Sequence, residues 1–302
     1  MKRTLGLTLL LFATLFSCMR QEKPLPAELS RAESVMWEHP DSALSILRSM
    51  PQSSLSIGKN YATWALLLAQ ARDKVYGKRL PDSLNIPSSD KLVQDAMDYF
   101  EKEGDLKRMA QTYYYKGQLL KDQKKITEAM PFFLKSKEMM TKLDEPLFTY
   151  LICQSLGNMY RYQDLYEESL VQLKDAYQYA LRSGNGERIS YALSELGRTY
   201  VHKNEMDSAL FYFGKSLDNA QRLGNIELEA MAMGELGVVY NKLSQGEKAL
   251  HYTRKELDLC LQISSLHKLP QVYYKIGSAF WSLGQLDSAK VYFQKSLETD
   301  NL

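Results

Sequence analysis

The sequence predicts an all-α fold, a right-handed α-solenoid of about seven antiparallel helical hairpins, two irregular and five regular. Five glycines recur at a constant interval, each forty positions after the one before: Gly117, Gly157, Gly197, Gly237 and Gly277. Segments such as 190–203 and 207–222 carry apolar residues at i, i+3, i+4 and i+7, the spacing of amphipathic helices. No segment shows the alternating pattern typical of a strand. Recurring pairs of helices without strands are typical of a solenoid.

The composition is that of a folded chain with little net charge. Of its 302 residues, 45% are hydrophobic and 25% are charged. The formal charge is +2, and both surplus cations, Lys2 and Arg3, lie within the segment 1–17, which contains no acidic residue. The rest of the chain is balanced. We therefore expect no nucleic-acid partner, because such proteins generally present a basic face to the phosphates.

Residues 1–17 have the features of a signal peptide. A basic start is followed by an apolar run over 5–16 and by a small residue before Cys18. This run of 12 residues is shorter than the roughly 20 that a spanning helix needs. Residues 18–26, with two prolines, read as a short tether.

The ending Leu15-Phe16-Ser17-Cys18 resembles the lipobox of bacterial lipoproteins. The resemblance implies a lipid anchor on Cys18, and two or more acyl chains hold a protein firmly on a membrane. We then expect a lipoprotein of the cell envelope, periplasmic or associated with the outer membrane. The alternative is that Cys18 is incidental and an ordinary signal peptidase cleaves nearby.

Residues 106–302 are predicted to form the five regular repeats. Further columns keep the same step as the glycines. Three residues after each glycine stand Leu120, Tyr160, Tyr200, Tyr240 and Phe280. Twelve residues after it stand Ala129, Ser169, Ala209, Ala249 and Ala289, and sixteen after it stand Phe133, Leu173, Phe213, Thr253 and Phe293. Glycine within a helix costs about 1 kcal/mol relative to alanine. We expect close packing of glycine against the small residue twelve positions later to offset this cost, with aromatic residues between hairpins.

These columns resemble the tetratricopeptide repeat, whose family positions match Leu196, Gly197, Tyr200, Ala209 and Phe213. The last copy matches through Tyr273, Ile276, Gly277, Phe280, Ala289 and Phe293. The resemblance covers about residues 110–299, and the period is forty positions where the family has about 34. It implies a bacterial lipoprotein with extended tetratricopeptide repeats.

Residues 27–105 are predicted to form two degenerate hairpins of the same kind. The motif Asp-Ser-Ala at 41–43 recurs at 207–209 and 287–289, which predicts a first hairpin over 27–50. A long amphipathic helix over 57–76 and a partner over 90–102 form the second, with a loop over 77–89 between them.

The ends of the regular helices also carry signals. Gly184 and Gly224 suit left-handed residues after second helices. Asp207 and Asp287 stand where an N-cap of a second helix is expected.

The resemblance also implies a partner-binding groove, formed by the first helix of each repeat. Its positions lie three before, one after and four to five after the repeat glycine. Carried over, they give Tyr114, Gln118, Gln154, Asn158, Arg161, Ser194, Arg198, His202, Asn241, Tyr274 and Trp281. Such amide, cationic and aromatic groups suit an extended peptide or a partner helix. The alternative is that these residues are only the solvated faces of amphipathic helices.

The sequence offers no chemistry for catalysis or cofactor binding. It contains no P-loop, no zinc-protease motif and no Gly-x-Ser-x-Gly. The four histidines and three cysteines lack metal spacing, and Cys153 and Cys260 are expected to be buried apolar residues. We therefore expect a protein that is not an enzyme and has no metal and no cofactor.

Two functions fit these features. The first is a membrane-tethered scaffold that binds a protein or peptide in the bacterial cell envelope. The second is the sensor half of a signalling or transcription-regulating system, which a membrane helix following in the reading frame would favour. The sequence leaves the oligomeric state open.

Overall fold

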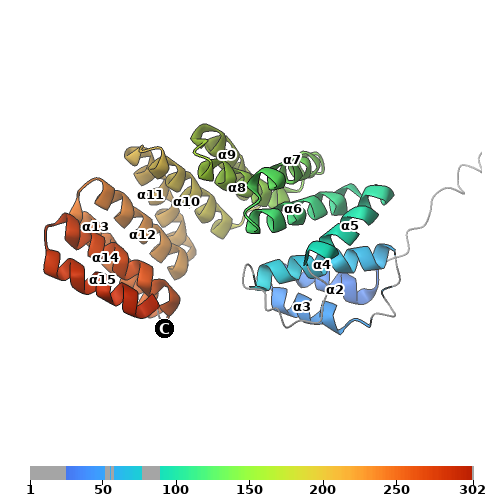
Figure 1. The fold of residues 1–302 in the computed structure, drawn as a ribbon, viewed down its shortest axis with the longest axis horizontal. Coiled ribbons are helices and arrows are strands. Elements are labelled where there is room, and N and C mark those ends of the chain that lie inside the picture. Colours follow the sequence, from blue (N-terminus) through green and yellow to red (C-terminus); the bar gives the residue numbers. More distant parts are fainter. Residues whose placement is uncertain (1–24, 52–54, 56–57, 77–88, 301–302) are drawn as a thin grey trace, which may run out of the picture. The chain divides into compact units, whose positions relative to one another are not determined.

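The computed structural model describes residues 25–51, 55, 58–76 and 89–300, and its helices are drawn in Figure 1. Within these residues there are fourteen α-helices, one short 3₁₀ turn and no strand. The helices form seven consecutive hairpins, which confirms the predicted all-α solenoid. The predicted signal peptide, Cys18 and the tether up to residue 24 lie outside the described residues. None of the described helices combines the length and apolar character that crossing a membrane requires.

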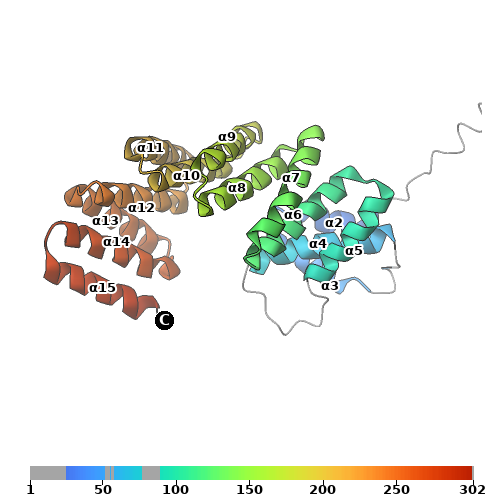
Figure 2. The ribbon, with the colours of Figure 1, turned by 45° about the horizontal axis from the view of Figure 1, so that its top comes forward.

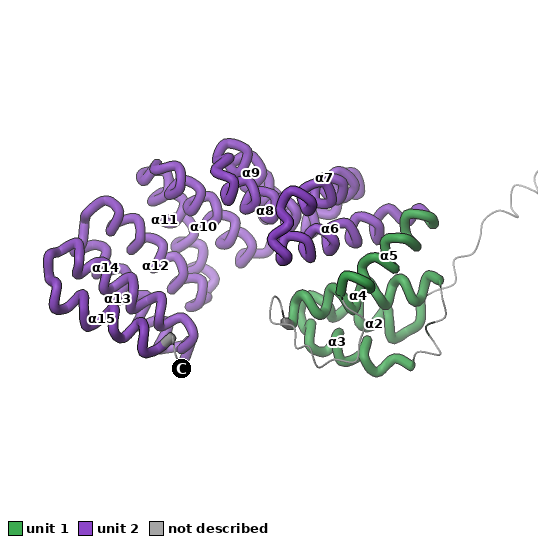
Figure 3. The backbone as a smooth tube through the Cα atoms, in the orientation of Figure 1, with its two compact units in different colours: residues 1–103 green, residues 104–302 purple. Residues whose placement is uncertain are grey.

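The chain divides into two compact units, residues 1–103 and 104–302 (Figure 3). The first unit contains α2 (Ala27–Val35), α3 (Pro40–Ser49), α4 (Lys59–Tyr76) and α5 (Ser89–Glu103). The helix α4 packs against α2, α3 and α5. Every residue of α4 from 62 to 72 is buried, so the predicted amphipathic pattern is wrong for this helix. Neighbouring helices cover it on several sides, and Trp64 Nε1 donates a hydrogen bond to the Leu47 carbonyl at 2.9 Å.

The second unit consists of the five regular hairpins. Their helices are α6 (Leu106–Asp122) and α7 (Ile126–Lys142), α8 (Pro146–Tyr162) and α9 (Tyr166–Arg182), α10 (Gly186–His202) and α11 (Met206–Leu223), α12 (Ile226–Lys242) and α13 (Gly246–Gln262), and α14 (Leu269–Ser282) and α15 (Leu286–Asp300). Each second helix also packs on the first helix of the next hairpin, as Figures 1 and 2 show. The first helices therefore stand in consecutive order along one side of this unit.

A left-handed residue recurs at every twentieth position in this unit. The series is Gly104, Lys124, Asp144, Asp164, Gly184, Asn204, Gly224, Ser244, Ser264 and Gly284. Each one follows a helix, so the long repeat consists of two halves of similar length that end in the same turn. The predicted left-handed glycines are confirmed, with φ of 66° at Gly184 and 62° at Gly224.

The predicted N-caps of the second helices are wrong. The N-cap of α11 is Glu205, which makes no side-chain capping bond, and Asp207 lies inside the first turn. Asp287 likewise follows the first residue of α15. Side-chain caps occur instead on first helices, where Asp105, Asn185 and Asn225 accept hydrogen bonds from backbone amides three residues later. The N-cap positions of α7, α9, α11 and α13 instead hold lysine, leucine, glutamate and glutamine, and none of these side chains makes a capping bond.

The repeat glycines allow close packing, but their partner is not the predicted one. A Cβ atom on Gly197 would lie 2.6 Å from the ring of Phe213, sixteen residues later. The same column provides the nearest atoms at the other four glycines, through Phe133, Leu173, Thr253 and Phe293. Each glycine therefore makes room for a larger side chain of the second helix. The alanine or serine of the twelve-residue column is buried beside it in every repeat.

Candidate functional site

The eleven predicted partner-binding residues lie on the first helices of the five regular hairpins. We call the positions three before, one after and four to five after each repeat glycine the first-helix face. The structure places the eleven residues in four environments on this face: buried in the core, held in ion pairs, partly buried and exposed. Only part of the set is available to a partner.

Tyr114 and Ser194 belong to the core, so their predicted availability to a partner is wrong. Tyr114 is 5% exposed and packs edge to face on Phe133 and Phe148. The Oγ of Ser194 is fully buried and lies 3.0 Å from the Oγ of Ser216. Phe148 belongs to the next hairpin, which explains the burial: the following first helix covers the position three before the glycine.

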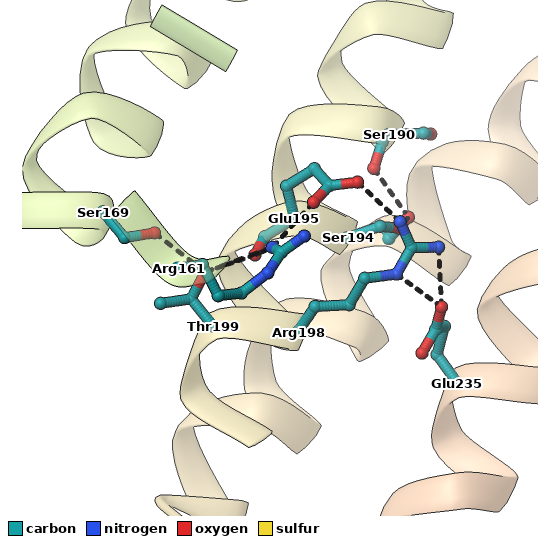
Figure 4. A network of polar contacts seen from close by, with 9 residues as sticks. Arg161, Ser169, Ser190, Ser194, Glu195, Arg198, Thr199 and Glu235 are labelled. Carbon is teal, nitrogen blue, oxygen red and sulfur yellow. Dashed lines mark hydrogen bonds and ion pairs between the residues drawn. The ribbon is translucent and has the colours of Figure 1, made fainter. Parts of the chain in front are cut away.

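Four charged side chains form a ladder across α8, α10 and α12 (Figure 4). Arg161 Nη1 lies 2.7 Å from Glu195 Oε2 and also donates to the Thr199 hydroxyl at 3.4 Å. Arg198 pairs with the other oxygen of Glu195 at 2.5 Å and with Glu235 at 2.6 Å. The ladder joins three consecutive repeats through alternating charges.

The ladder changes the role of the two predicted arginines. Arg161 is only 8% exposed and has its partners within the chain, so it is not a free cation for a ligand. The Arg198 side chain is 32% exposed and lies between two carboxylates. Sequence analysis missed Glu195 and Glu235, which stand two residues before the repeat glycines of the third and fourth regular repeats. The sequence does contain a signal for this ladder: each arginine has a residue of opposite charge close to one repeat later, at separations of 34 and 37 residues.

The amide side chains of the face are partly buried. Gln118 donates to the Tyr114 hydroxyl at 3.1 Å and accepts from Lys121 Nζ at 2.6 Å. Gln154 is also half-buried. The Oδ1 atoms of Asn158 and Asn241 are buried and have no hydrogen-bond partner among the described residues. A buried amide oxygen without a hydrogen bond destabilises the folded chain. Rotation of either amide could expose its oxygen, which could then accept a hydrogen bond from a bound segment.

Most exposed members of the face are aromatic or imidazole groups, and its exposed charges are Asp122 and Lys242, the last residues of α6 and α12. Tyr274 is 60% exposed and Trp281 is 64% exposed, both on α14, and Tyr162 on α8 is 79% exposed. His202 is also exposed, and its ring centroid lies 6.3 Å from that of Tyr166. Partial burial and the nearby Arg161 lower the pKa of His202, which keeps its ring neutral at neutral pH. Apart from these two charges at helix ends, the exposed part of the face offers π-surfaces and neutral polar groups.

A second ion pair, also missed by sequence analysis, joins the fourth and fifth regular repeats. Glu256 of α13 reaches past Gly234 of α12 to Lys275 of α14, with Oε1 and Nζ 2.7 Å apart. A Cβ atom on Gly234 would overlap with Glu256 Oε1. The equivalent residues Ser136, Ser216 and Ser296 instead donate to carbonyls of their first helices. The signal in the sequence for this ion pair was the acidic Glu256 at a repeat position that otherwise holds small residues.

The Glu256 carboxyl gives a pH-dependent stability. Burial raises its pKa, and Lys275 offsets this effect only in part. The folded chain then holds this proton more tightly than the unfolded chain, so the stabilisation is complete below the ordinary glutamate pKa of about 4.3 and is lost as the pH rises through the raised folded-state pKa. We expect the melting temperature of the wild type to rise relative to Glu256→Gln as the pH falls from neutral through this window.

Thermal unfolding at a series of pH values measures this difference. The control is Glu138→Gln, since Lys142 lowers the pKa of the exposed Glu138 carboxyl and the trend has the opposite sign. A wild-type advantage over Glu256→Gln that did not change with pH would contradict the assignment.

The described residues offer no cluster of three or more histidine, cysteine or acidic side chains that suits a metal ion. The expected burial of Cys153 and Cys260 is confirmed. Burial raises the pKa of the Cys153 thiol to about 11, which keeps it protonated at neutral pH.

These features define the class of protein: an α-solenoid of stacked helical hairpins with a repeating first-helix face. Residues 110–139 and 270–301 match the family model described as the tetratricopeptide repeat. Two of the regular hairpins, α6–α7 and α14–α15, therefore match the tetratricopeptide repeat. A comparison with curated protein sequences gives no match.

Solved structures with the same fold include a quorum sensor and a protein with a tetratricopeptide repeat sensor. Apo RapI aligns with a TM-score of 0.66 at 14% identity, over 91% of this chain and 96% of that chain. NprR in complex with its cognate peptide NprX aligns with a TM-score of 0.64 at 15% identity, over 90% and 77%. A signal-transduction ATPase with a tetratricopeptide repeat sensor, from Pyrococcus horikoshii, aligns with a TM-score of 0.69 at 16% identity, over 91% and 41%. At these identities the similarity shows the fold alone.

Proposed function

We propose that this chain is a scaffold that binds a protein or peptide segment along the first-helix face. The observation that carries the proposal is the polar and aromatic surface that consecutive first helices present, with its ion pairs already formed between repeats. A preorganised surface loses little conformational entropy on binding. The peptide complex of NprR, a protein of the same fold, supports a segment as the partner.

Site-specific photocrosslinking in the cells that make the protein tests this proposal. A benzophenone amino acid replaces Tyr274 on the first-helix face or, as the control, Val171 on a second helix, which is 58% exposed. We expect a discrete crosslinked product from position 274 and none from position 171. Products of equal yield at both positions, or none at position 274, would contradict binding on this face.

We also propose that a lipid on Cys18 holds the scaffold on a membrane of the bacterial cell envelope. The support is the basic start, the short apolar run and the small residue before Cys18. Cells grown with labelled palmitate should label the wild-type chain and leave Cys18→Ala unlabelled. The Cys153→Ala variant, which removes a buried thiol, is the matched control and should keep the label. Equal labelling of wild type and Cys18→Ala would rule the anchor out.

We propose binding without catalysis as the activity. Arg161 and Arg198 of the first-helix face are held in ion pairs, and burial raises the pKa of both buried thiols. A nucleophile needs a free base beside it or a lowered pKa, and neither buried cysteine has a lowered pKa.

A second candidate function is the sensor half of a signalling system. The alignment with the repeat sensor of the Pyrococcus horikoshii ATPase favours it, although this chain spans only 41% of that protein. Deletion of the gene separates the two proposals. A scaffold should change the recovery of an envelope protein, whereas a sensor should change transcription in response to a ligand.

A further inference from the structure

The last described hairpin exposes two aromatic side chains at positions that are covered in earlier repeats. Tyr274 and Trp281 lie three before and four after Gly277, and both are more than half exposed. Their equivalents Tyr114 and Arg161 are buried by the next first helix, through Phe148 and Glu195 respectively. The α14 surface is therefore a first-helix surface that lacks a described neighbour.

The adjacent helix α15 differs from the earlier second helices in one column that meets the next hairpin, although Leu297 on the same helix is exposed and apolar. In earlier repeats one column joins a second helix to the next hairpin: Leu170 clusters with Leu196, Leu210 with Leu236, and Leu250 with Leu269. The same column has Lys290 in α15, which is exposed. A lysine at this place makes burial against another hairpin costly. Within the described residues, no side chain covers the aromatic pair on α14.

The charges of the first-helix face indicate the chemistry of that occupant. Arg161 and Arg198 are balanced by Glu195 and Glu235, and Lys275 is balanced by Glu256. An acidic segment would meet the carboxylates beside each arginine, and a basic segment would meet the arginines beside each carboxylate. Face positions on α12 and α14 include Val238, Asn241, Tyr274 and Trp281, and their one exposed charge is Lys242, the last residue of α12.

We infer that the partner is an extended segment without net charge, which places an aromatic or aliphatic side chain against Tyr274 and Trp281. This inference rests on the proposed function and specifies its ligand class. Aromatic pairs contribute beyond the area that they bury, and exposed aromatic residues are common centres of binding energy. Attraction between net charges has little part in this recognition, so its affinity depends weakly on salt.

Selection of short random peptides displayed on phage against the immobilised full chain tests the inference. We expect the enriched peptides to be rich in aromatic and aliphatic residues, with acidic and basic residues rare or balanced. A synthetic copy of the most enriched peptide should change its affinity less than about threefold between roughly 0.05 and 0.5 M NaCl. Trp281→Ala should weaken it by about tenfold or more. The control Phe211→Ala removes a 55% exposed ring from a second helix and should leave the affinity unchanged.

The other outcomes are distinct. Enrichment of acidic peptides that bind in a salt-dependent manner, and are lost in Arg198→Gln, would overturn the inference and leave peptide binding intact. Failure to enrich any peptide family would count against the proposed function as well. Self-association of the full chain that Trp281→Ala abolishes would identify the aromatic pair as a contact between copies, and would also overturn the inference.

Discussion

Gly197→Ala is expected to lower the free energy of unfolding by about 1 kcal/mol, although alanine is the better helix former. The new methyl carbon would lie 2.6 Å from the Phe213 ring, which is fully buried and has no room to move aside. Overpacking of this kind costs about 1 to 3 kcal/mol and more than offsets the gain of about 1 kcal/mol in helix propensity. Urea unfolding followed by helical circular dichroism measures the change.

Gly214→Ala in the same hairpin is the matched control. Gly214 lies inside α11, next to Phe213 in the chain, and a Cβ atom there would have no atom within 4 Å. The same substitution then brings only the gain in helix propensity, so we expect about 0.5 to 1 kcal/mol of added stability. Equal effects at the two positions would show that the repeat glycine is not held by its contact with Phe213.

This pair of glycines also shows how far the sequence determines the fold. The forty-position spacing correctly predicts that Gly197 lies on a first helix at a close contact, and that Gly214 does not belong to the repeating column. It does not show which side chain fills the space, because the alanine column and the phenylalanine column both face the first helix. The structure resolves this point through the geometry of the ring.

The turns are only partly visible in the sequence. Left-handed residues recur at every twentieth position, yet only Gly104, Gly184, Gly224 and Gly284 of the ten are glycines. At the other six places the turn holds lysine, aspartate, asparagine or serine. Neighbouring helices fix these turns, so local propensity does not reveal them. The twenty-residue period of the turns was therefore not visible in the spacing of the glycines, on which the predicted forty-residue repeat was based.

The sequence predicted on which helices the candidate site residues lie, but not whether their side chains are buried, paired or exposed. The rule of columns placed Arg161, Arg198 and Trp281 on the correct helices, but it treated all repeats alike. Exposure depends on the next hairpin, which buries Arg161, whereas Trp281 has no following hairpin among the described residues and is exposed. The partners Glu195 and Glu235 come from other repeats, at separations that a single amphipathic pattern does not contain.

Glu195→Met is expected to lower the free energy of unfolding by about 3 kcal/mol, because it leaves the buried Arg161 guanidinium without its carboxylate. The desolvation cost of a buried charge remains when its partner is removed, and the Thr199 hydroxyl is a weak substitute. Arg198 loses less, since it is partly exposed and keeps Glu235. Hydrogen exchange of the α8 and α10 amides should locate the loss at this junction.

The double variant Arg161→Met with Glu195→Met shows whether the loss of stability comes from the unpaired charge of Arg161 or from altered packing at position 195. Replacing both members of a buried pair by apolar residues is often close to neutral, so we expect the double variant to recover most of the loss. Glu138→Met is the control, because the Glu138–Lys142 pair is exposed on both sides and its removal should leave the stability almost unchanged. If the double variant were as unstable as Glu195→Met alone, the cost would come from packing at Glu195, and the ladder would not be the electrostatic link between these repeats.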